Sequence, residues 1–339
     1  MEAVTTGRAG NVLAMKIVIP DDYQGIVDRL SCFSLLAGHH VVRYREPAVD
    51  LEQLVERLHE ADVVVAIRER VHFSRALIER LPNLRLIALV GRAATTIGYA
   101  ACEERNIMVS TGASNSPVAP AELTIALIVA SRRNIALEAE RMRRGDWPCT
   151  LSHRLSGSTL GIFGLGAIGS IVARAGAGMG MKILAWGQAT SAAKAAASGY
   201  EFAASKADLF ERADVLSLHV RLRADTRGIV GQDELSRMKP TSLLVNTSRA
   251  ELIRPGALLA ALRAGRPGYA AVDVYEQEPV TNGDHPLLSM PNVLCTPHLG
   301  WAEWDNFELY FRECFEQIVA YAEGTKMRLA RPPGIAPRA

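Results

Sequence analysis

Residues 159–180, TLGIFGLGAIGSIVARAGAGMG, decide the fold of this chain. A short apolar strand, TLGIF, runs into the glycine loop GLGAIG, and a helix-forming stretch follows at once. Gly164, Gly166 and Gly169 have the spacing GxGxxG, which between a strand and a helix indicates a dinucleotide site. The first glycine allows a tight turn, the second a close approach of pyrophosphate, and the third close packing of helix on sheet. A glycine turn used only for packing is the alternative.

The start of this helix predicts the phosphate contacts. N–H groups in a first helical turn lack intrahelical partners and favour anions, so we expect Ala167, Ile168 and Gly169 to bind the phosphates. No GK[ST] follows the loop, which argues against a triphosphate site.

The next strand, MKILAWG, ends at the residues expected to contact the adenosine ribose, Trp186, Gly187 and Gln188. NAD sites usually place Asp or Glu about 20 residues after the loop, to bind the ribose hydroxyls. No carboxylate stands here. Its absence removes repulsion against a 2′-phosphate and slightly favours NADP over NAD, whereas a site that accepts either cofactor is the alternative.

The second half of the chain contains six strand candidates, namely TLGIFG, MKILAWG, ADVLSLHV, TSLLVNTS, GYAAVDVY and NVLCTPH. Three of them precede a polar side chain: Arg249 follows 242–245, Glu278 follows 269–274, and His298 follows 292–295. Ligands of open α/β sheets bind outside the carboxyl ends of the strands. The three side chains are therefore expected to converge there, and a guanidinium, a carboxylate and an imidazole suit redox chemistry on a small carboxylic acid.

The first half also alternates strands and helices. Strand candidates are MKIVIP, HHVVRYRE, ADVVVAIRER and NLRLIALVG, and helices are predicted over about 26–36, 51–58 and 74–81. This order implies a second parallel sheet. An uninterrupted helix is predicted from about Pro120 to Arg144, because Pro120 lies near its start and Gly145 just past its end. An amphipathic helix is predicted over 302–324.

Composition limits the class of protein. With 339 residues, 49% of them hydrophobic and 22% charged, the chain suits two α/β domains, each with its own core. The net charge of +2 gives no reason to expect nucleic acid or a membrane surface as partner. No apolar run reaches the roughly 18 residues of a spanning helix. Five scattered cysteines without CxxC, and no secretory signal, favour reduced thiols and a cytoplasmic location. The histidines are dispersed, so we expect no metal site.

Together these motifs resemble the D-isomer-specific 2-hydroxyacid dehydrogenase family, and in particular glyoxylate/hydroxypyruvate reductases. The matching segments are GIFGLGAIG, ADVLSLHV with TRGIV, MKPTSLLVNTSRAELI, AVDVYEQEP and TPHLG, in the family's order. The resemblance implies two Rossmann-like domains. A parallel-sheet NAD(P)-binding domain would span 114–298. A flavodoxin-like substrate domain would comprise 15–113 and 299–326, with flexible tails at 1–14 and 327–339. It also implies a homodimer that interconverts 2-keto and D-2-hydroxy acids.

The same resemblance assigns the chemistry. His298 resembles the family's general acid/base, Glu278 the carboxylate that orients it, and Arg249 the group that binds the substrate carboxylate and carbonyl oxygen. Asp273 resembles the residue that binds the nicotinamide amide, with capping of local N–H groups as its alternative. His219 is expected to shape the cofactor pocket through its backbone, rather than as a second base. Further cofactor contacts are implied for Thr247 and Gly300.

The substrate side departs from the family. The usual VGxGxDNID loop reads VGRAATTIG over residues 90–98, so Ala93 or Ala94 replaces the second glycine and the Asp-Asn pair is missing. Backbone donation to the substrate carboxylate from Gly91 and Arg92 stays possible. Arg68 matches an arginine beside the substrate and would bind a second anionic group, or else is a solvated charge at a strand end.

Two other functions share this fold. A formate-dehydrogenase-like relative needs no proton donor, which the Glu278–His298 pair argues against. A non-enzymatic, corepressor-like nucleotide sensor would keep the fold and even the three polar residues.

Overall fold

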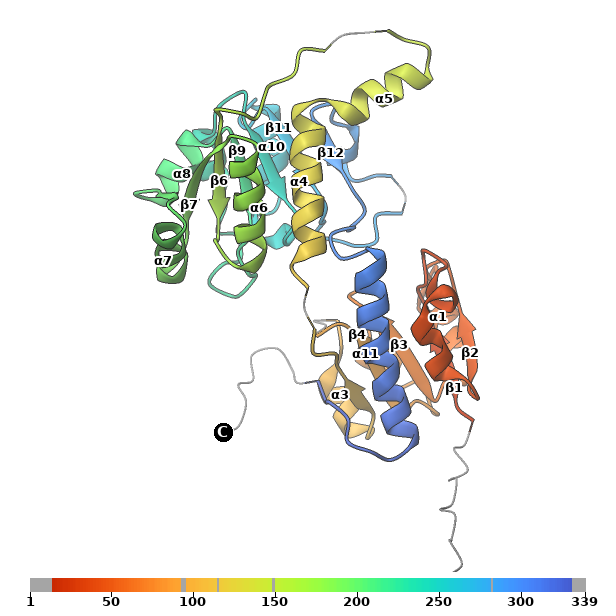
Figure 1. Ribbon diagram of the computed structural model, residues 1–339. Coiled ribbons are helices and arrows are strands. Elements are labelled where there is room, and N and C mark those ends of the chain that lie inside the picture. Colours follow the sequence, from red (N-terminus) through yellow and green to blue (C-terminus); the bar gives the residue numbers. More distant parts are fainter. Residues whose placement is uncertain (1–13, 93–95, 115, 148–149, 282, 331–339) are drawn as a thin grey trace, which may run out of the picture. The chain divides into compact units, whose positions relative to one another are not determined.

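The computed structural model describes residues 14–92, 96–114, 116–147, 150–281 and 283–330, which form two compact α/β units (Figure 1). One unit comprises residues 1–115 and 304–339, and the other residues 116–303. The divisions therefore fall after 115 and 303, rather than after the expected 113 and 298.

The first unit is built on a five-stranded parallel sheet in the order β2-β1-β3-β4-β5. The strands are β1 (Lys16–Ile19), β2 (His40–Arg43), β3 (Val63–Ile67), β4 (Leu86–Val90) and β5 (Met108–Ser110). This order is that of flavodoxin-like folds and confirms the expected architecture. Every residue of β3 and β4 is buried, as in parallel sheets covered on both faces.

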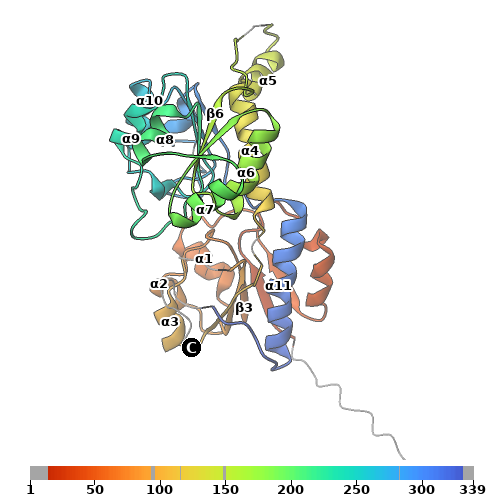
Figure 2. The ribbon, with the colours of Figure 1, turned by 60° about the vertical axis from the view of Figure 1, so that its left-hand side comes forward.

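Helices cover both faces of this sheet (Figure 2). The helices are α1 (Leu51–Leu58), α2 (Arg75–Ile78), α3 (Tyr99–Glu104) and α11 (Trp304–Ala322). Buried side chains of the first three pack with alternate residues of the strands, such as Val64 and Ile87. Helix α11 covers the other face, where the thiol of its Cys314 lies 3.5 Å from the carbonyl oxygen of Ala88.

The single helix predicted over 26–36 is not found. Two 3₁₀ segments, η1 (Val27–Arg29) and η2 (Ser31–Leu36), occupy this stretch. The carboxylate of Glu308, in α11, accepts hydrogen bonds from the N–H groups of Ser31 and Cys32, at 2.8 and 2.9 Å. These N–H groups are thus bound by a side chain from another helix, which fixes a break after Leu30.

The end of the first unit also differs from expectation, because a flexible tail was predicted from residue 327. Residues 328–330 instead pair with the edge strand β5. The N–H of Thr111 donates to the carbonyl of Arg328 at 3.0 Å, and that of Ala330 to Val109 at 2.7 Å, around an antiparallel bridge between Ser110 and Leu329. An edge strand offers unpaired N–H and C=O groups, which this segment satisfies.

The second unit contains a seven-stranded parallel sheet in the order β12-β11-β10-β9-β6-β7-β8. The six expected strands are β6 (Thr159–Phe163), β7 (Lys182–Trp186), β9 (Val215–Leu218), β10 (Leu243–Asn246), β11 (Tyr269–Val272) and β12 (Val293–Cys295), and the short β8 (Glu201–Phe202) was not predicted. The order reverses between β6 and β9, which places the crevice for a dinucleotide beside the glycine loop.

Two sets of helices enclose this sheet. The helices are α4 (Val118–Arg132), α5 (Ile135–Arg143), α6 (Ala167–Gly178), α7 (Ala189–Ala197), α8 (Lys206–Arg212), α9 (Gln232–Arg237) and α10 (Ala257–Arg263), with 3₁₀ turns η3 (Ala250–Leu252) and η4 (Pro286–Ser289). Buried residues of α8–α10 pack on one face, and those of α4 and α6 on the other.

The long helix predicted from Pro120 to Arg144 is interrupted. Helix α4 ends at Arg132, and Asn134 adopts a left-handed conformation with φ of 53° before α5 begins. The Arg132 guanidinium donates to the carbonyl of Thr241 at 2.7 Å, and the Asn134 amide to the hydroxyl of Thr150 at 3.0 Å. Asn tolerates this conformation better than most residues, so the break falls on it.

Candidate active site

The glycine loop joins β6 to α6, and its three glycines meet different constraints. Gly164 has φ of +100°, and a Cβ there would lie 2.9 Å from the carbonyl group of His219. A Cβ on Gly169 would lie 2.3 Å from the carbonyl oxygen of Gly164. Gly166 has an ordinary φ of −82°, and a Cβ there would meet no described atom within 4 Å. Packing therefore requires the first and third glycines, whereas the bare backbone at Gly166 leaves space for a ligand such as a pyrophosphate.

The structure adds Ser191, whose hydroxyl accepts a hydrogen bond from the N–H of Leu165 at 3.2 Å. A Cβ on Gly187 would lie 2.7 Å from the same hydroxyl oxygen, so this glycine lets α7 approach the loop. Ser191 thereby fixes the turn, together with the hydrogen bond from Gly164 N–H to the carbonyl of Trp186 at 2.8 Å.

The residues at the end of β7 lie where a ribose is expected. Trp186 packs edge-on against Phe163, with 5.0 Å between the ring centroids. Gln188 precedes the first turn of α7 without a side-chain cap hydrogen bond. The strand end contains no carboxylate, as the sequence indicated.

His219 and Thr247 are held by hydroxyl groups. The Nε2 atom of His219 lies 2.8 Å from the hydroxyl of Ser217, and its buried Nδ1 has no hydrogen-bond partner among the described residues. Burial lowers the pKa of His219 to about 4, so the imidazole is neutral near pH 7. So low a pKa makes the ring a weak base, which supports the expectation that His219 is not a second base. The hydroxyl of Thr247 lies 2.7 Å from that of Thr124.

Glu278 and His298 contact each other, as predicted from the sequence. The Nδ1 atom of His298 lies 2.6 Å from Oε2 of Glu278, and Oε1 accepts the N–H of Tyr275 at 2.9 Å. Burial raises the pKa of Glu278, but the hydrogen bond and charge of His298, with the N–H of Tyr275, outweigh it and leave the pKa below its ordinary value. Glu278 is therefore ionised at neutral pH and fixes Nδ1 as the N–H of the ring.

Arg249 belongs to the same unit and acts electrostatically on this pair, since its charge also lowers the pKa of Glu278. Its Nη1 donates to the carbonyl of Ser248 at 2.7 Å. Asn246, which the sequence did not single out, shapes the loop: its amide donates to the carbonyl of Arg249 at 2.9 Å and accepts the N–H of Ser248 at 3.1 Å. The pattern N-T-S-R contains the signal, because Asn side chains commonly bind the backbone two residues on.

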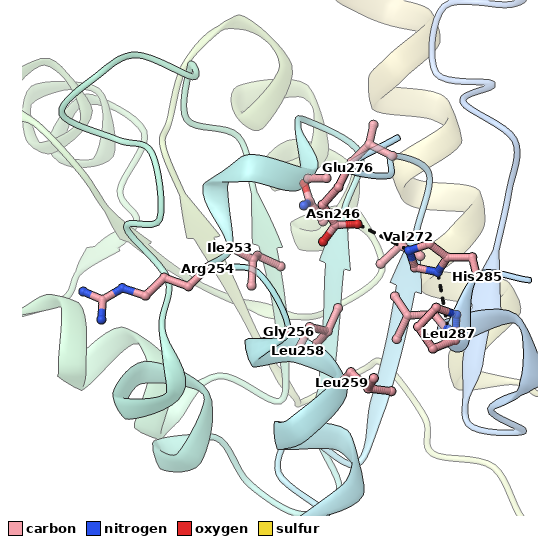
Figure 3. A pocket seen from close by; sticks show the side chains of 13 residues that line it. Asn246, Ile253, Arg254, Gly256, Leu258, Leu259, Val272, Glu276, His285 and Leu287 are labelled. Atoms are coloured by element: carbon pink, nitrogen blue, oxygen red, sulfur yellow. Dashed lines mark hydrogen bonds and ion pairs between the residues drawn. The ribbon is translucent and has the colours of Figure 1, made fainter. Parts of the chain in front are cut away.

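A cavity of about 140 Å³ lies at the carboxyl ends of β10 and β11 (Figure 3). Its walls are largely apolar, and at its rim Glu276 and His285 lie 3.3 Å apart. Asn246, the last residue of β10, and Glu276 line it, next to the loops that contain Arg249 and Glu278. The three expected catalytic side chains are not among its lining residues, so this cavity backs the loops and is not where those side chains act.

Asp273 and Gly300, both expected to contact the cofactor, bind each other. The N–H of Gly300 donates to Oδ2 of Asp273 at 2.8 Å, and the N–H of Leu299 to Oδ1 at 2.7 Å. The alternative for Asp273, capping of local N–H groups, is what the described residues display.

The expected substrate residues of the first unit lie at neighbouring strand ends. Arg68 follows β3 and Gly91 follows β4, both at positive φ, and a Cβ on Gly91 would lie 2.8 Å from Nη1 of Arg68. The guanidinium thus packs on the bare backbone of Gly91. The carbonyl of Arg92 accepts the hydroxyl of Thr111 at 2.6 Å. Ala93 and Ala94, where the loop departs from the family, lie outside the described residues.

This combination of a glycine loop at the sheet's reversal point and an imidazole–carboxylate pair with a nearby guanidinium defines a nicotinamide-dependent oxidoreductase. Residues 125–300 match the sequence model described as "D-isomer specific 2-hydroxyacid dehydrogenase, NAD binding domain". The chain belongs to this dehydrogenase family.

Relatives and solved structures agree with this assignment. A putative D-3-phosphoglycerate dehydrogenase from Ralstonia solanacearum superimposes with a TM-score of 0.90 at 42% identity, over 96% of this chain and 99% of that one. Glyoxylate reductase of Aeropyrum pernix is 33% identical over 83% of this chain and 85% of its own length. D-3-phosphoglycerate dehydrogenase of Methanocaldococcus jannaschii is 36% identical over 74% of this chain, but the match spans only 47% of that longer protein.

Proposed function

We propose that this protein interconverts a 2-keto acid and the D-2-hydroxy acid, with His298 as the general acid/base. The observation that carries the proposal is the 2.6 Å contact between His298 Nδ1 and Glu278 Oε2. This contact holds Nδ1 as a donor to Glu278 and leaves Nε2 available to a substrate oxygen. The family also includes enzymes named for phosphoglycerate and glyoxylate, and both names describe small hydroxy or keto acids.

The nicotinamide supplies or accepts the hydride when the cofactor is bound. The residues of the chain handle the proton and the charge. In the reducing direction, His298 donates a proton from Nε2 to the ketone oxygen, and Glu278 stabilises the imidazolium that precedes this donation. In the oxidising direction the neutral ring accepts the proton. Arg249 binds the substrate carboxylate with its planar fork and polarises the carbonyl oxygen.

The first unit would contribute to binding of the substrate. We propose that the backbone N–H groups of Gly91 and Arg92 donate to the substrate carboxylate. The positive φ of Gly91 and the Arg68 guanidinium packed against it support a site with anion-binding groups at these strand ends. A second anionic group on the substrate would contact Arg68.

The cofactor is NAD or NADP, held by the glycine loop and the strand ends of the second unit. We propose a modest preference for NADP. The end of β7 lacks the carboxylate that would repel a 2′-phosphate. The unfilled space at Gly166, and the first turn of α6 without a side-chain cap, support the fit of a pyrophosphate.

The test of the whole proposal is steady-state turnover of glyoxylate, hydroxypyruvate and phenylpyruvate, each with NADH and with NADPH. We expect measurable reduction of at least one keto acid, with NADPH giving the larger kcat/KM. Absence of turnover with every keto acid would contradict the proposal and favour the nucleotide-sensor alternative. A larger kcat/KM with NADH would contradict only the cofactor preference.

Gly166→Ala is expected to weaken cofactor binding without destabilising the protein. The new Cβ meets no described atom, but it projects where the pyrophosphate is proposed to approach. Overpacking of this kind costs about 1–3 kcal/mol, or roughly 5–150-fold in Kd for NADPH measured by fluorescence titration. Gly169→Ala is the matched variant: its Cβ would meet the carbonyl oxygen of Gly164, so it should lower Tm instead. Unchanged Kd in Gly166→Ala would exclude a pyrophosphate at this position.

We propose a cytoplasmic homodimer. Helix α5 has no buried residue, and its apolar Ile135 and Met142 are more than half exposed, which supports contact with a second copy. Cys32, Cys102, Cys295 and Cys314 are free thiols, in keeping with a reducing compartment. Within the described part of the chain, we find no helix that combines the length and the apolar character needed to cross a bilayer.

A further inference from the structure

Asp273 is the first residue after β11, and its fully buried carboxylate binds the loop that contains His298. Oδ1 accepts the hydroxyl of Thr296 at 2.6 Å and the N–H of Leu299 at 2.7 Å. Oδ2 accepts the N–H of Gly300 at 2.8 Å. The loop is therefore attached to one carboxylate on both sides of the catalytic imidazole.

His298 itself has an unusual backbone conformation. Its φ is +51°, in the left-handed region that non-glycine residues rarely adopt. Such a conformation persists where the surrounding structure fixes it, and it clusters at functional sites. Within the loop, the N–H of His298 donates to the carbonyl of Thr296 at 3.1 Å. The three hydrogen bonds to Asp273 constrain the loop from outside, together with the contact of the His298 imidazole with Glu278.

We propose that Asp273 is a positioning residue for proton transfer: it holds residues 296–300 so that the His298 imidazole points at the substrate oxygen. The inference rests on the proposed function of His298, and it gives Asp273 a role through the loop in addition to the cofactor contact that the family resemblance implies. Burial raises the pKa of Asp273, while Thr296, Leu299 and Gly300 act in the opposite direction. A carboxylate with this surrounding is suited to binding N–H and O–H donors of its own chain.

Asp273→Asn tests the proposal. An amide has the same shape but offers one acceptor oxygen in place of two, so either Leu299 or Gly300 loses its partner. Misplacement of a catalytic group by about 1 Å costs on the order of 10²-fold in rate. We therefore expect kcat, measured at saturating reduced cofactor, to fall by about 10²-fold. Weaker cofactor binding with an unchanged kcat at saturating cofactor would overturn the proposal and favour a role through the nicotinamide amide alone.

A double-mutant cycle with His298→Gln separates positioning from general destabilisation. If Asp273 acts through the imidazole, Asp273→Asn adds no further loss to the residual rate of His298→Gln. Additive losses would overturn the proposal. Full turnover in His298→Gln alone would instead contradict the proposed function, so the two failures are distinguishable.

Two further variants keep the test decisive. Thr296→Val removes one donor to Asp273 and should lower kcat, by less than Asp273→Asn does. It keeps the test available even if Asp273→Asn fails to fold. Thr296→Ser retains the hydroxyl and should keep the original rate. Asp214→Asn is the matched control, because this carboxylate also binds its own chain, at 2.8 Å from Thr159 N, away from the site. It should lower Tm and leave kcat unchanged. Unchanged kcat in Thr296→Val and Asp273→Asn would overturn the proposal.

Discussion

His298→Gln is expected to lower kcat for reduction of a 2-keto acid by about 10²–10⁴-fold, the contribution of a positioned general acid. Glutamine is polar and similar in length, but it cannot transfer a proton near neutral pH. The Kd of NADPH should stay unchanged, because Glu278 and the glycine loop keep their other partners. Stopped-flow turnover and fluorescence titration on one preparation measure both quantities.

The control for this variant is His153→Gln. The side chain of His153 is exposed, and the residue contributes a backbone hydrogen bond to the carbonyl of Arg132. This substitution should leave kcat and Kd as they are. Loss of cofactor binding in His298→Gln would mean that the fold of the second unit, rather than proton transfer, had been altered.

Arg249→Lys is expected to lower kcat/KM for the keto acid by about 10²–10³-fold. Lysine keeps the positive charge but lacks the planar fork that binds two oxygens at once. Truncating one partner of a hydrogen-bonded charge pair costs about 2–5 kcal/mol, which includes this range. We expect KM to rise and kcat to fall together, because the guanidinium would bind the carboxylate in the ground state and polarise the carbonyl in the transition state.

Arg237→Lys is the matched control for that substitution. Arg237 lies on the surface of the same unit, where its guanidinium pairs with Glu211 at 2.6 Å, and exposed pairs contribute little. Steady-state kinetics of the control should equal those of the unchanged protein. A kcat/KM for Arg249→Lys within about threefold of the original would exclude direct carboxylate binding by this residue.

The sequence predicted those parts of the fold where local pattern and tertiary structure agree. The apolar runs at 63–67 and 86–90 became strands because both faces of a parallel sheet are covered. Helix α1 was predicted over 51–58 and is found there, because its start is capped by Asp50, whose carboxylate accepts the N–H of Gln53 at 2.8 Å. The strand ends, which meet at one edge of a sheet, predicted that Glu278 and His298 lie close together, and the family resemblance implied their contact.

The differences arise where a distant side chain decides the local structure. The carboxylate of Glu308 binds N–H groups 277 and 276 residues earlier in the chain and favours 3₁₀ turns where a helix was expected. The break at Asn134 depends on hydrogen bonds to Thr150 and, from Arg132, to Thr241. Periodicity reports which face of an element is apolar, but it carries no information on partners so distant in sequence.

Asp273 illustrates the same limit within the active site. The sequence indicated that an acid follows β11, and both a contact with the nicotinamide amide and capping of its own chain were open. Only the structure reveals that Thr296, Leu299 and Gly300 donate to this carboxylate.

The Ser191 hydroxyl has a practical consequence for redesign of coenzyme preference. Exchange of residues 187–191 to alter coenzyme preference would also remove the acceptor for Leu165 N–H, at 3.2 Å, and so loosen the glycine turn. We therefore expect an exchanged segment that retains Ser191 to bind either coenzyme more tightly than the same segment with Ser191→Ala.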